Sequence, residues 1–183
     1  SMTAVIGGDA DEVLAAIEAA GLTPANHNGK GQVVAAGTVE QLEAFAAKPP
    51  SRTRLFPLSV AGAFHTVHME PAVDHLREVA AAMPTTTPSV ALLSNLDGNV
   101  VTDGREFANR LVNQVAHPVR WDLCMDTMVE RSVTGLLELA PAGTLTGIAK
   151  RNLKGVELFN LNTPDQIPAA REFVAAHSSK ENA

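Results

Sequence analysis

The first 58 residues alternate short apolar runs with segments of helical periodicity. Four runs have the length and composition of strands: residues 2–6, 22–28, 32–36 and 54–60. Two segments, which start after Asp9 and Thr38, carry apolar residues at helical spacing, and each of these two residues has Glu or Gln three positions later. The order βαββαβ is typical of a ferredoxin-like subdomain. We therefore expect residues 1–58 to form one small subdomain.

Beyond residue 58 the pattern changes to longer helical segments that alternate with strongly apolar runs. The runs that predict strands are residues 90–94, 135–139 and 156–161. The segments that predict helices are residues 71–83, 105–115, 121–131, 145–153 and 163–177. Strands that alternate with helices usually form a mostly parallel sheet covered on both faces. Residues 59–183 are therefore expected to belong to a second domain, of the α/β class.

The composition is that of a packed, soluble protein. Of the 183 residues, 45% are hydrophobic and 19% are charged, and the net charge is about −6. With no run of lysine or arginine, we expect neither nucleic acid nor an anionic membrane as a partner. No apolar stretch has the length of a membrane span, which favours a cytoplasmic protein. The single Cys124 excludes an internal disulfide and a cysteine-based zinc site.

Candidate chemistry is concentrated just after the fourth predicted strand, where Phe64 and His65 follow the small residues 61–63. A histidine on a loop held by a strand and a helix can take up and return a proton near neutral pH. The alternative is a structural imidazole with a fixed hydrogen bond. His65 and His68 could also suggest a metal, but apart from Glu70 no third nearby ligand has matching spacing, so no metal site is expected.

The fifteen-residue string 58–72 (LSVAGAFHTVHMEPA) resembles the histidine motif of the malonyl-CoA:acyl carrier protein transacylases. Three further strings resemble landmarks of that family in the same order: residues 26–37, 114–121 and 137–147. The resemblance implies an acyltransferase that moves a malonyl group from malonyl-CoA to the phosphopantetheine thiol of acyl carrier protein, for fatty-acid biosynthesis and without a cofactor. It also implies a ferredoxin-like small subdomain followed by the C-terminal part of an α/β-hydrolase-like domain.

The resemblance assigns roles to five residues. His65 would be the general base, oriented by the backbone carbonyl of Gln114, whose alternative is a helix-end glutamine that faces water. Phe64 would restrict the substrate at its α-carbon, although discrimination of one methyl group is worth only about 1 to 3 kcal/mol. Asn26 and Asn28 would line the cleft, and the alternative is an asparagine pair that stabilises a hairpin.

The nucleophile of the family is a serine in a Gly-x-Ser-x-Gly elbow, and this sequence contains no such string. The family's arginine for the malonyl carboxylate also has no counterpart here. We therefore expect the C-terminal part of a longer enzyme, inactive by itself, with the missing N-terminal part as a partner. Two alternatives remain: an acyltransferase domain of a polyketide synthase, and a non-catalytic module that binds acyl carrier protein.

Overall fold

The computed structural model describes residues 1–178, which divide into two compact units. Unit 1 comprises Ser1–Cys124, and unit 2 begins at Met125. The domain boundary predicted between residues 58 and 59 lies within unit 1. A division of unit 1 at that point stays a prediction. Each unit is described by itself below.

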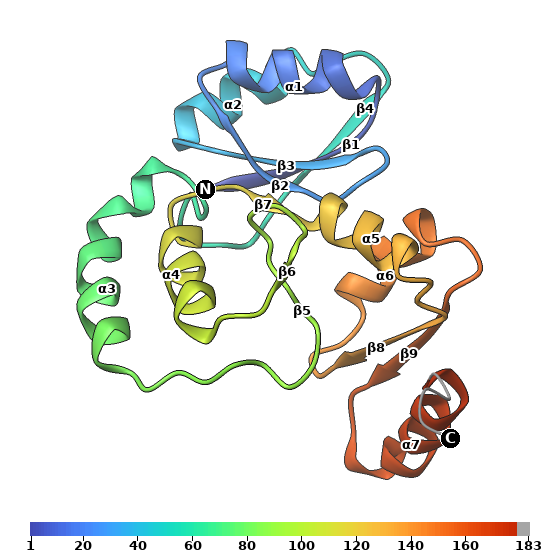
Figure 1. Ribbon diagram of the computed structural model, residues 1–183. Helices are drawn as coiled ribbons and strands as arrows, with labels where there is room; N and C mark the ends of the chain where they lie inside the picture. The colour runs from blue at the N-terminus through green and yellow to red at the C-terminus, as the bar shows by residue number, and fades with distance from the viewer. Residues whose placement is uncertain (179–183) are drawn as a thin grey trace. The chain divides into compact units, whose positions relative to one another are not determined.

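Unit 1 is built on a five-stranded sheet with the strand order β4-β1-β3-β2-β7 (Figure 1). Its strands are β1 (Met2–Gly7), β2 (Thr23–His27), β3 (Gln32–Ala36), β4 (Thr53–Pro57) and β7 (Val119–Arg120). The first four pair antiparallel, whereas β7 joins the edge of β2 in parallel. The chain thus runs β1-α1-β2-β3-α2-β4 before a distant segment adds the fifth strand.

Helices α1 (Ala10–Ala19) and α2 (Val39–Ala47) cover one face of this sheet (Figure 1). The Asp9 carboxylate accepts hydrogen bonds from two backbone N–H groups in the first turn of α1. Thr38 and Gln41 form a reciprocal capping box at the start of α2. Each cap satisfies N–H groups that have no partner inside the helix. Both predicted helix starts are confirmed.

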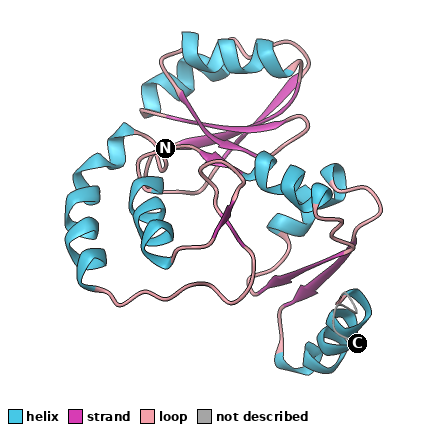
Figure 2. Ribbon diagram, in the orientation of Figure 1, coloured by secondary structure: helices cyan, strands magenta, loops and turns pink. Residues whose placement is uncertain are grey.

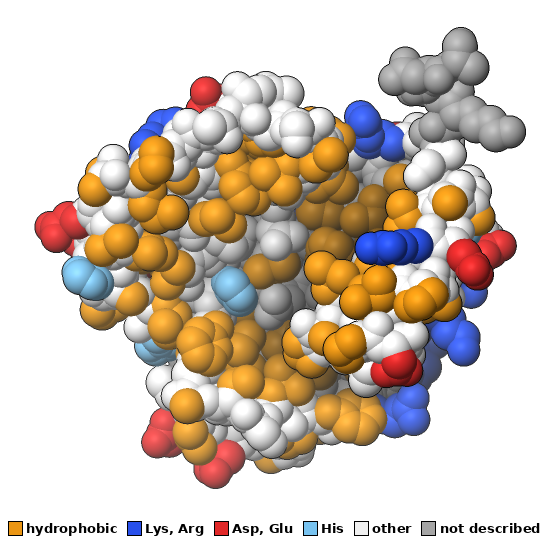
Figure 3. Space-filling view, turned by 90° about the horizontal axis from the view of Figure 1, so that it is seen from below, with side chains coloured by type: hydrophobic (Ala, Val, Ile, Leu, Met, Phe, Trp, Pro, Cys, Tyr) orange, Lys and Arg blue, Asp and Glu red, His pale blue; other side chains and the backbone are white. Residues whose placement is uncertain are grey.

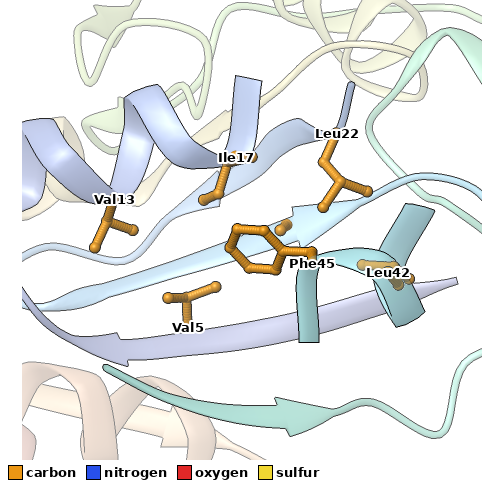
Figure 4. Packing of buried hydrophobic residues seen from close by; sticks show 7 residues of the cluster. Val5, Val13, Ile17, Leu22, Leu42 and Phe45 are labelled. Carbon is orange, nitrogen blue, oxygen red and sulfur yellow. The ribbon is translucent and has the colours of Figure 1, made fainter. Parts of the chain in front are cut away.

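The core between the helices and the sheet is formed by seven buried apolar residues (Figure 4). They are Val5, Val13, Ile17, Leu22, Ala35, Leu42 and Phe45. Ile17 is fully buried, and each large apolar side chain buried in this way contributes about 1.5 to 3 kcal/mol. On the opposite face of the sheet a second cluster includes Ala4, Ala25 and Val34, and it also contains Ala63 from the loop after β4.

The remaining elements of unit 1 are η1 (Val67–Ala72), α3 (Val73–Ala82), β5 (Leu92–Leu93), β6 (Val100–Val101), α4 (Gly104–Gln114) and the start of α5 (Trp121–Glu130). The strand predicted over residues 90–94 is wrong for most of its length. Only Leu92–Leu93 pairs, and it pairs antiparallel with β6. Val90 is 74% exposed. An apolar run becomes a strand only where another strand can pair with it. The local sequence pattern does not indicate whether such a partner strand exists.

The helix predicted over residues 71–83 begins earlier than predicted, and its first part is a 3₁₀ helix. Thr66 caps the 3₁₀ helix η1, and the α-helix proper starts at Val73. Pro71 lies within η1, where its missing N–H removes one backbone donor. Val67 on η1, Val79 on α3 and Met83, directly after α3, are apolar side chains that are at least half exposed. Hydrophobic side chains are also frequent on the face of the molecule drawn in Figure 3.

Unit 2 contains two parallel strands, β8 (Gly135–Leu139) and β9 (Glu157–Leu161), connected through α6 (Thr144–Asn152) (Figure 2). The short η2 (Pro164–Gln166) and α7 (Ile167–His177) follow. Both predicted strands and their parallel pairing are confirmed, while in the described part of the chain β5 does not join them. The chain is therefore a mixed α/β protein with parallel strand pairs in two of its sheets.

A buried carboxylate connects β8 to α6 in unit 2. Glu138 is 8% exposed and accepts hydrogen bonds from the backbone N–H groups of Gly143, Leu145 and Thr146, at 2.8 to 2.9 Å, and from the Thr146 hydroxyl at 3.0 Å. Burial acts to raise the pKa of Glu138, but these hydrogen bonds outweigh it and lower that pKa to about 2. Glu138 thus serves as the side-chain cap of α6, since Gly143 at the N-cap position has no side chain to do so.

None of the helices within residues 1–178 combines the length and the apolar character needed to cross a bilayer.

Candidate active site

His65 lies on the loop between β4 and η1, in a backbone conformation that few side chains adopt. Its φ angle is 60°, in the left-handed region. For a residue with a side chain this conformation costs about 1 to 2 kcal/mol. Neighbouring contacts must therefore hold His65 in place, and such strain at a loop residue is a frequent property of functional sites.

The hydroxyl of Thr66 supplies two of these contacts. Thr66 is 1% exposed, and its Oγ1 donates to the backbone oxygen of Ala63 at 2.6 Å. The same oxygen accepts a hydrogen bond from the backbone N–H of His68 at 3.2 Å. The hydroxyl therefore connects the residues on both sides of His65. Sequence reasoning missed this residue, because a threonine after a histidine has no local signature.

The imidazole of His65 contacts the end of α4. Its Nδ1 lies 2.8 Å from the backbone oxygen of Gln114, the last residue of that helix. The last carbonyls of a helix have no partner within it, and they carry the negative end of the helix dipole. A carbonyl only accepts, so Nδ1 carries the proton in the neutral ring and the lone pair is on Nε2. The structure thus joins His65 and Gln114, as the resemblance predicted, while their catalytic roles stay predictions.

The side chain of Gln114 also has a structural part that the sequence did not indicate. Its Nε2 donates to the backbone oxygens of His117 and Pro118, at 2.8 and 2.9 Å. These two hydrogen bonds close the turn between α4 and β7. The side chain of Gln114 is therefore bound to the backbone that follows its own carbonyl and does not only face water, while its role at the site stays a prediction.

Asn26 lies in the sheet close to that turn. It pairs with Val119 of β7 in parallel and with Val34 of β3 across a β-bulge. Partners in an antiparallel pair point to the same face, so Asn26 faces the same side of the sheet as Val34. Ala63 packs against that face. The sheet thus brings Asn26 to the side from which the His65 loop approaches, although its role in substrate binding stays a prediction.

Asn28 lies just beyond β2, in the connection to β3. Its backbone N–H donates to the oxygen of Gln32 at 3.0 Å, which closes the hairpin. The backbone of Asn28 therefore takes part in the hairpin, in agreement with the alternative interpretation. Substrate contact by its side chain stays a prediction.

Phe64 is the exposed member of the loop. It is 40% exposed, and its ring lies over Gly62, where an added Cβ would be 3.5 Å from the ring. The ring therefore has one face on the loop backbone and one side accessible to a ligand. That placement is compatible with a selectivity residue, which stays a prediction.

Charged groups border β7 on the side of His27. Arg120 donates to both carboxylate oxygens of Asp122, at 3.0 and 2.8 Å, and pairs with His27 in the β2–β7 register. Burial and the nearby Arg120 lower the pKa of His27, and Asp122 opposes this only in part. The lowered pKa favours the neutral form of the His27 ring.

A small cavity lies beside the end of α4. Its volume is about 40 Å³, and its lining includes Ser94, Asn95 and Gln114. That is room for one or two water molecules and not for an acyl group. Within residues 1–178, no three His, Cys, Asp or Glu side chains lie close enough together to hold a metal ion.

Comparison with known proteins finds sequences that are named as transacylases. The malonyl CoA-acyl carrier protein transacylase of Mycobacterium tuberculosis is 49% identical over 163 residues, which are 89% of this chain and 54% of that protein. The enzyme of the same name from Escherichia coli K12 is 34% identical over 179 residues, which cover 94% of this chain and 58% of its own length. No family model matches the chain.

Solved structures agree with the sequence comparison. The crystal structure of MCAT from Mycobacterium tuberculosis superposes with a TM-score of 0.88 at 48% identity, covering 92% of this chain and 56% of that one. A type II PKS acyl-carrier protein in complex with its malonyl-transacylase gives a TM-score of 0.84 at 30% identity, covering 93% of this chain and 57% of that one.

By sequence and structure, this chain is related to enzymes that transfer acyl groups. Its relatives are, specifically, the malonyl CoA-acyl carrier protein transacylases, so the family resemblance is confirmed. The chain spans somewhat more than half the length of each of the relatives described above.

Proposed function

We propose that this chain supplies the general base of a malonyl-CoA:acyl carrier protein transacylase, an [acyl-carrier-protein] S-malonyltransferase of fatty-acid biosynthesis. The observation that carries the proposal is the 2.8 Å contact between His65 Nδ1 and the Gln114 oxygen. It gives the ring the orientation and tautomer that a base needs, without a carboxylate. The names of the relatives supply the substrate and the acceptor: malonyl-CoA and acyl carrier protein.

The proposed chemistry has two halves. In the first, Nε2 of His65 accepts the proton of a serine hydroxyl as the serine oxygen attacks the thioester carbon of malonyl-CoA, and the proton then passes to the departing thiolate. In the second, Nε2 takes the proton of the phosphopantetheine thiol as its sulfur attacks the acyl-serine, and returns it to the serine oxygen. Each proton that Nε2 accepts is returned within the same half, so the proposed steps invoke no cofactor.

The carbonyl of Gln114 would stabilise the imidazolium that forms in each half. Its partial negative charge, reinforced by the C-terminus of α4, faces the Nδ1–H that gains positive character when Nε2 is protonated. Phe64, at the exposed side of the same loop, would limit the size of the substrate next to the reacting carbon. Asn26 and Asn28 would contribute amide groups from the sheet and its hairpin.

Finer features of the architecture belong to the same proposal. The order β1-α1-β2-β3-α2-β4, with the sheet order β4-β1-β3-β2, supports the interpretation of residues 1–58 as a ferredoxin-like subdomain. Residues 59–183 would be the C-terminal portion of an α/β-hydrolase-like domain. The acyl-serine would lie on a further segment of the enzyme, since the printed sequence has no Gly-x-Ser-x-Gly string. We place the enzyme in the cytoplasm.

The test compares two polypeptides: this chain, and the same chain extended upstream through a serine elbow. Each is incubated with malonyl-CoA and its intact mass is measured. The proposal expects a malonyl adduct on the extended chain alone. In that chain, replacement of His65 by Ala should lower malonyl transfer to acyl carrier protein by about 10²- to 10⁴-fold, the usual contribution of a general base.

His75→Ala is the matched control, because His75 is an exposed histidine on α3, outside the proposed site. Its transfer rate should equal that of the unmodified chain. An adduct on the short chain would place the nucleophile within these residues and refute this division of roles. If neither polypeptide is acylated while the short chain binds acyl carrier protein, the chain is a binding module instead.

A further inference from the structure

We propose that Thr66 is a positioning residue for His65. Its hydroxyl holds the histidine in the left-handed conformation that directs Nδ1 to the Gln114 carbonyl. The inference rests on the proposed function for its biological meaning. Its physical content, a link between one hydroxyl and the tautomer of one imidazole, can be measured independently of catalysis.

The hydrogen bonds of Thr66 span the strained residue. Oγ1 donates to the oxygen of Ala63, two residues before His65, and accepts from the N–H of His68, three residues after it. The hydrogen bond to Ala63 is buried and the one from His68 is partly buried, with Thr66 itself 1% exposed. Removing the hydroxyl would leave an acceptor and a donor unsatisfied on the two sides of the φ 60° residue.

One end of this bridge is anchored in the sheet. Ala63 is 6% exposed and belongs to the apolar cluster that includes Ala4, Ala25 and Val34. Ala4, Ala25 and Val34 lie on the paired strands β1, β2 and β3. Packing against them restricts the position of Ala63 and of its backbone oxygen. Through Thr66 that fixed point determines the path of the backbone at His65, and so the direction of its side chain.

The residue type fits this role. Threonine carries the hydroxyl on a β-branched carbon, which restricts its χ1 angle and reduces the entropy lost when the hydroxyl is fixed. Serine provides the same oxygen with more rotational freedom. Valine has nearly the shape of threonine without the oxygen, so it removes the bridge without creating a cavity.

A simpler role must be distinguished from this one. Thr66 is also the N-cap of η1, and a cap contributes stability without any effect on a neighbouring histidine. Thr38 caps α2 by the same kind of contact, a hydroxyl that accepts from a backbone N–H at 3.2 Å, but it has no histidine beside it. The variant Thr38→Val therefore measures what the loss of a threonine cap does by itself.

The experiment uses this 183-residue chain, labelled with ¹⁵N, and reads the ring nitrogen shifts of its histidines by NMR at a pH where the rings are neutral. These shifts report which nitrogen carries the proton. In the unmodified chain His65 should be in the Nδ1–H form. Thr66→Val should lower the ratio of the Nδ1–H to the Nε2–H form at His65 by about fivefold or more, the factor that one net hydrogen bond represents. Thr66→Ser and Thr38→Val should leave it unchanged.

His117 is an internal reference in the same spectrum. Its Nδ1 lies 2.7 Å from the oxygen of Asn113, next to Gln114 on α4. An unchanged His117 shows that the acceptor helix has not moved. The proposal is overturned if His65 keeps its tautomer in Thr66→Val, or if His65 and His117 change together. Should Thr66→Val fail to fold, loss of the His65 tautomer in Thr66→Ser would overturn it equally.

The outcome separates this inference from the proposed function. A His65 tautomer that depends on Thr66, in an enzyme whose malonyl transfer survives His65→Ala, would leave the positioning intact and remove the general-base assignment. Conversely, if His65→Ala lowers malonyl transfer but Thr66→Val leaves the His65 tautomer unchanged, the proposed function stands and the positioning role of Thr66 is refuted.

Discussion

Replacing Glu138 by Gln should destabilise the chain in a manner that depends on pH. The carboxylate accepts four hydrogen bonds at the start of α6, and these lower the pKa of Glu138 from its ordinary value of 4.5 to about 2. A lowering of that size corresponds to about 3 kcal/mol of preference for the charged form. Glutamine keeps one oxygen that can accept part of these hydrogen bonds, so the loss expected at pH 7 is about 1 to 2 kcal/mol.

The direction of the pH effect follows from the lowered pKa. The folded chain holds the proton of Glu138 less tightly than the unfolded chain, so the stabilisation is fully present above pH 4.5 and is lost as the pH falls toward 2. Roughly two fifths of it should be gone at pH 3.5. The difference between the unmodified chain and Glu138→Gln should shrink accordingly, because glutamine does not titrate.

Urea unfolding followed by circular dichroism at pH 7 and pH 3.5 measures both effects. Glu172→Gln is the matched control, since Glu172 is an exposed carboxylate on α7 of the same unit. Surface substitutions of this kind change stability by no more than about 0.5 kcal/mol. The reasoning is refuted if Glu138→Gln behaves like Glu172→Gln at pH 7, or if its deficit is as large at pH 3.5 as at pH 7.

Two further predictions concern the reactivity of Cys124 and the cost of replacing two glycines, Gly98 and Gly155. Burial, with smaller contributions from Asp122 and Asp97, raises the pKa of the Cys124 thiol from 9.0 to about 11. A disulfide reagent at pH 8 should therefore modify Cys124 in the native chain at least about 100-fold more slowly than in the chain unfolded in urea. Similar rates in the two states would contradict this. Gly98 and Gly155 both have positive φ, 72° and 83°, but an added Cβ at Gly98 would lie 2.4 Å from the Leu123 backbone, whereas at Gly155 it meets nothing within 4 Å. Gly155→Ala should therefore cost about 1 kcal/mol and Gly98→Ala at least about 2 kcal/mol more in urea unfolding, and equal costs would refute the steric explanation.

Local pattern was sufficient where local forces decide the structure. The caps at Asp9 and Thr38 depend on residues within one helical turn, so the sequence predicted where α1 and α2 begin. The hairpin ending at Gln32–Ala36 has a glycine turn and alternating residues, and its position was also predicted. The run at residues 90–94 failed because the identity of a strand's partner is a property of the whole fold.

The candidate site was predictable only in part, for the same reason. His65 and Gln114 are separated by 49 positions, and no periodicity joins them, so their contact came from the family resemblance alone. Thr66 acts through two backbone atoms and has no sequence signature. Glu138 did have one: a charge inside the apolar strand Gly135–Leu139, just before a helix, indicates a buried carboxylate with a specific partner.

The parallel pairing of β2 with β7 affects the order in which the chain can fold during synthesis. The strands β1 to β4 lie within the first 57 residues, so they can leave the ribosome and pair while the rest is still untranslated. The edge of β2 that pairs with β7 has no partner strand until Val119 has been synthesised. Gln114 is synthesised five residues earlier. Completion of the sheet and the contact between His65 and Gln114 thus both depend on the same short segment, residues 114–119.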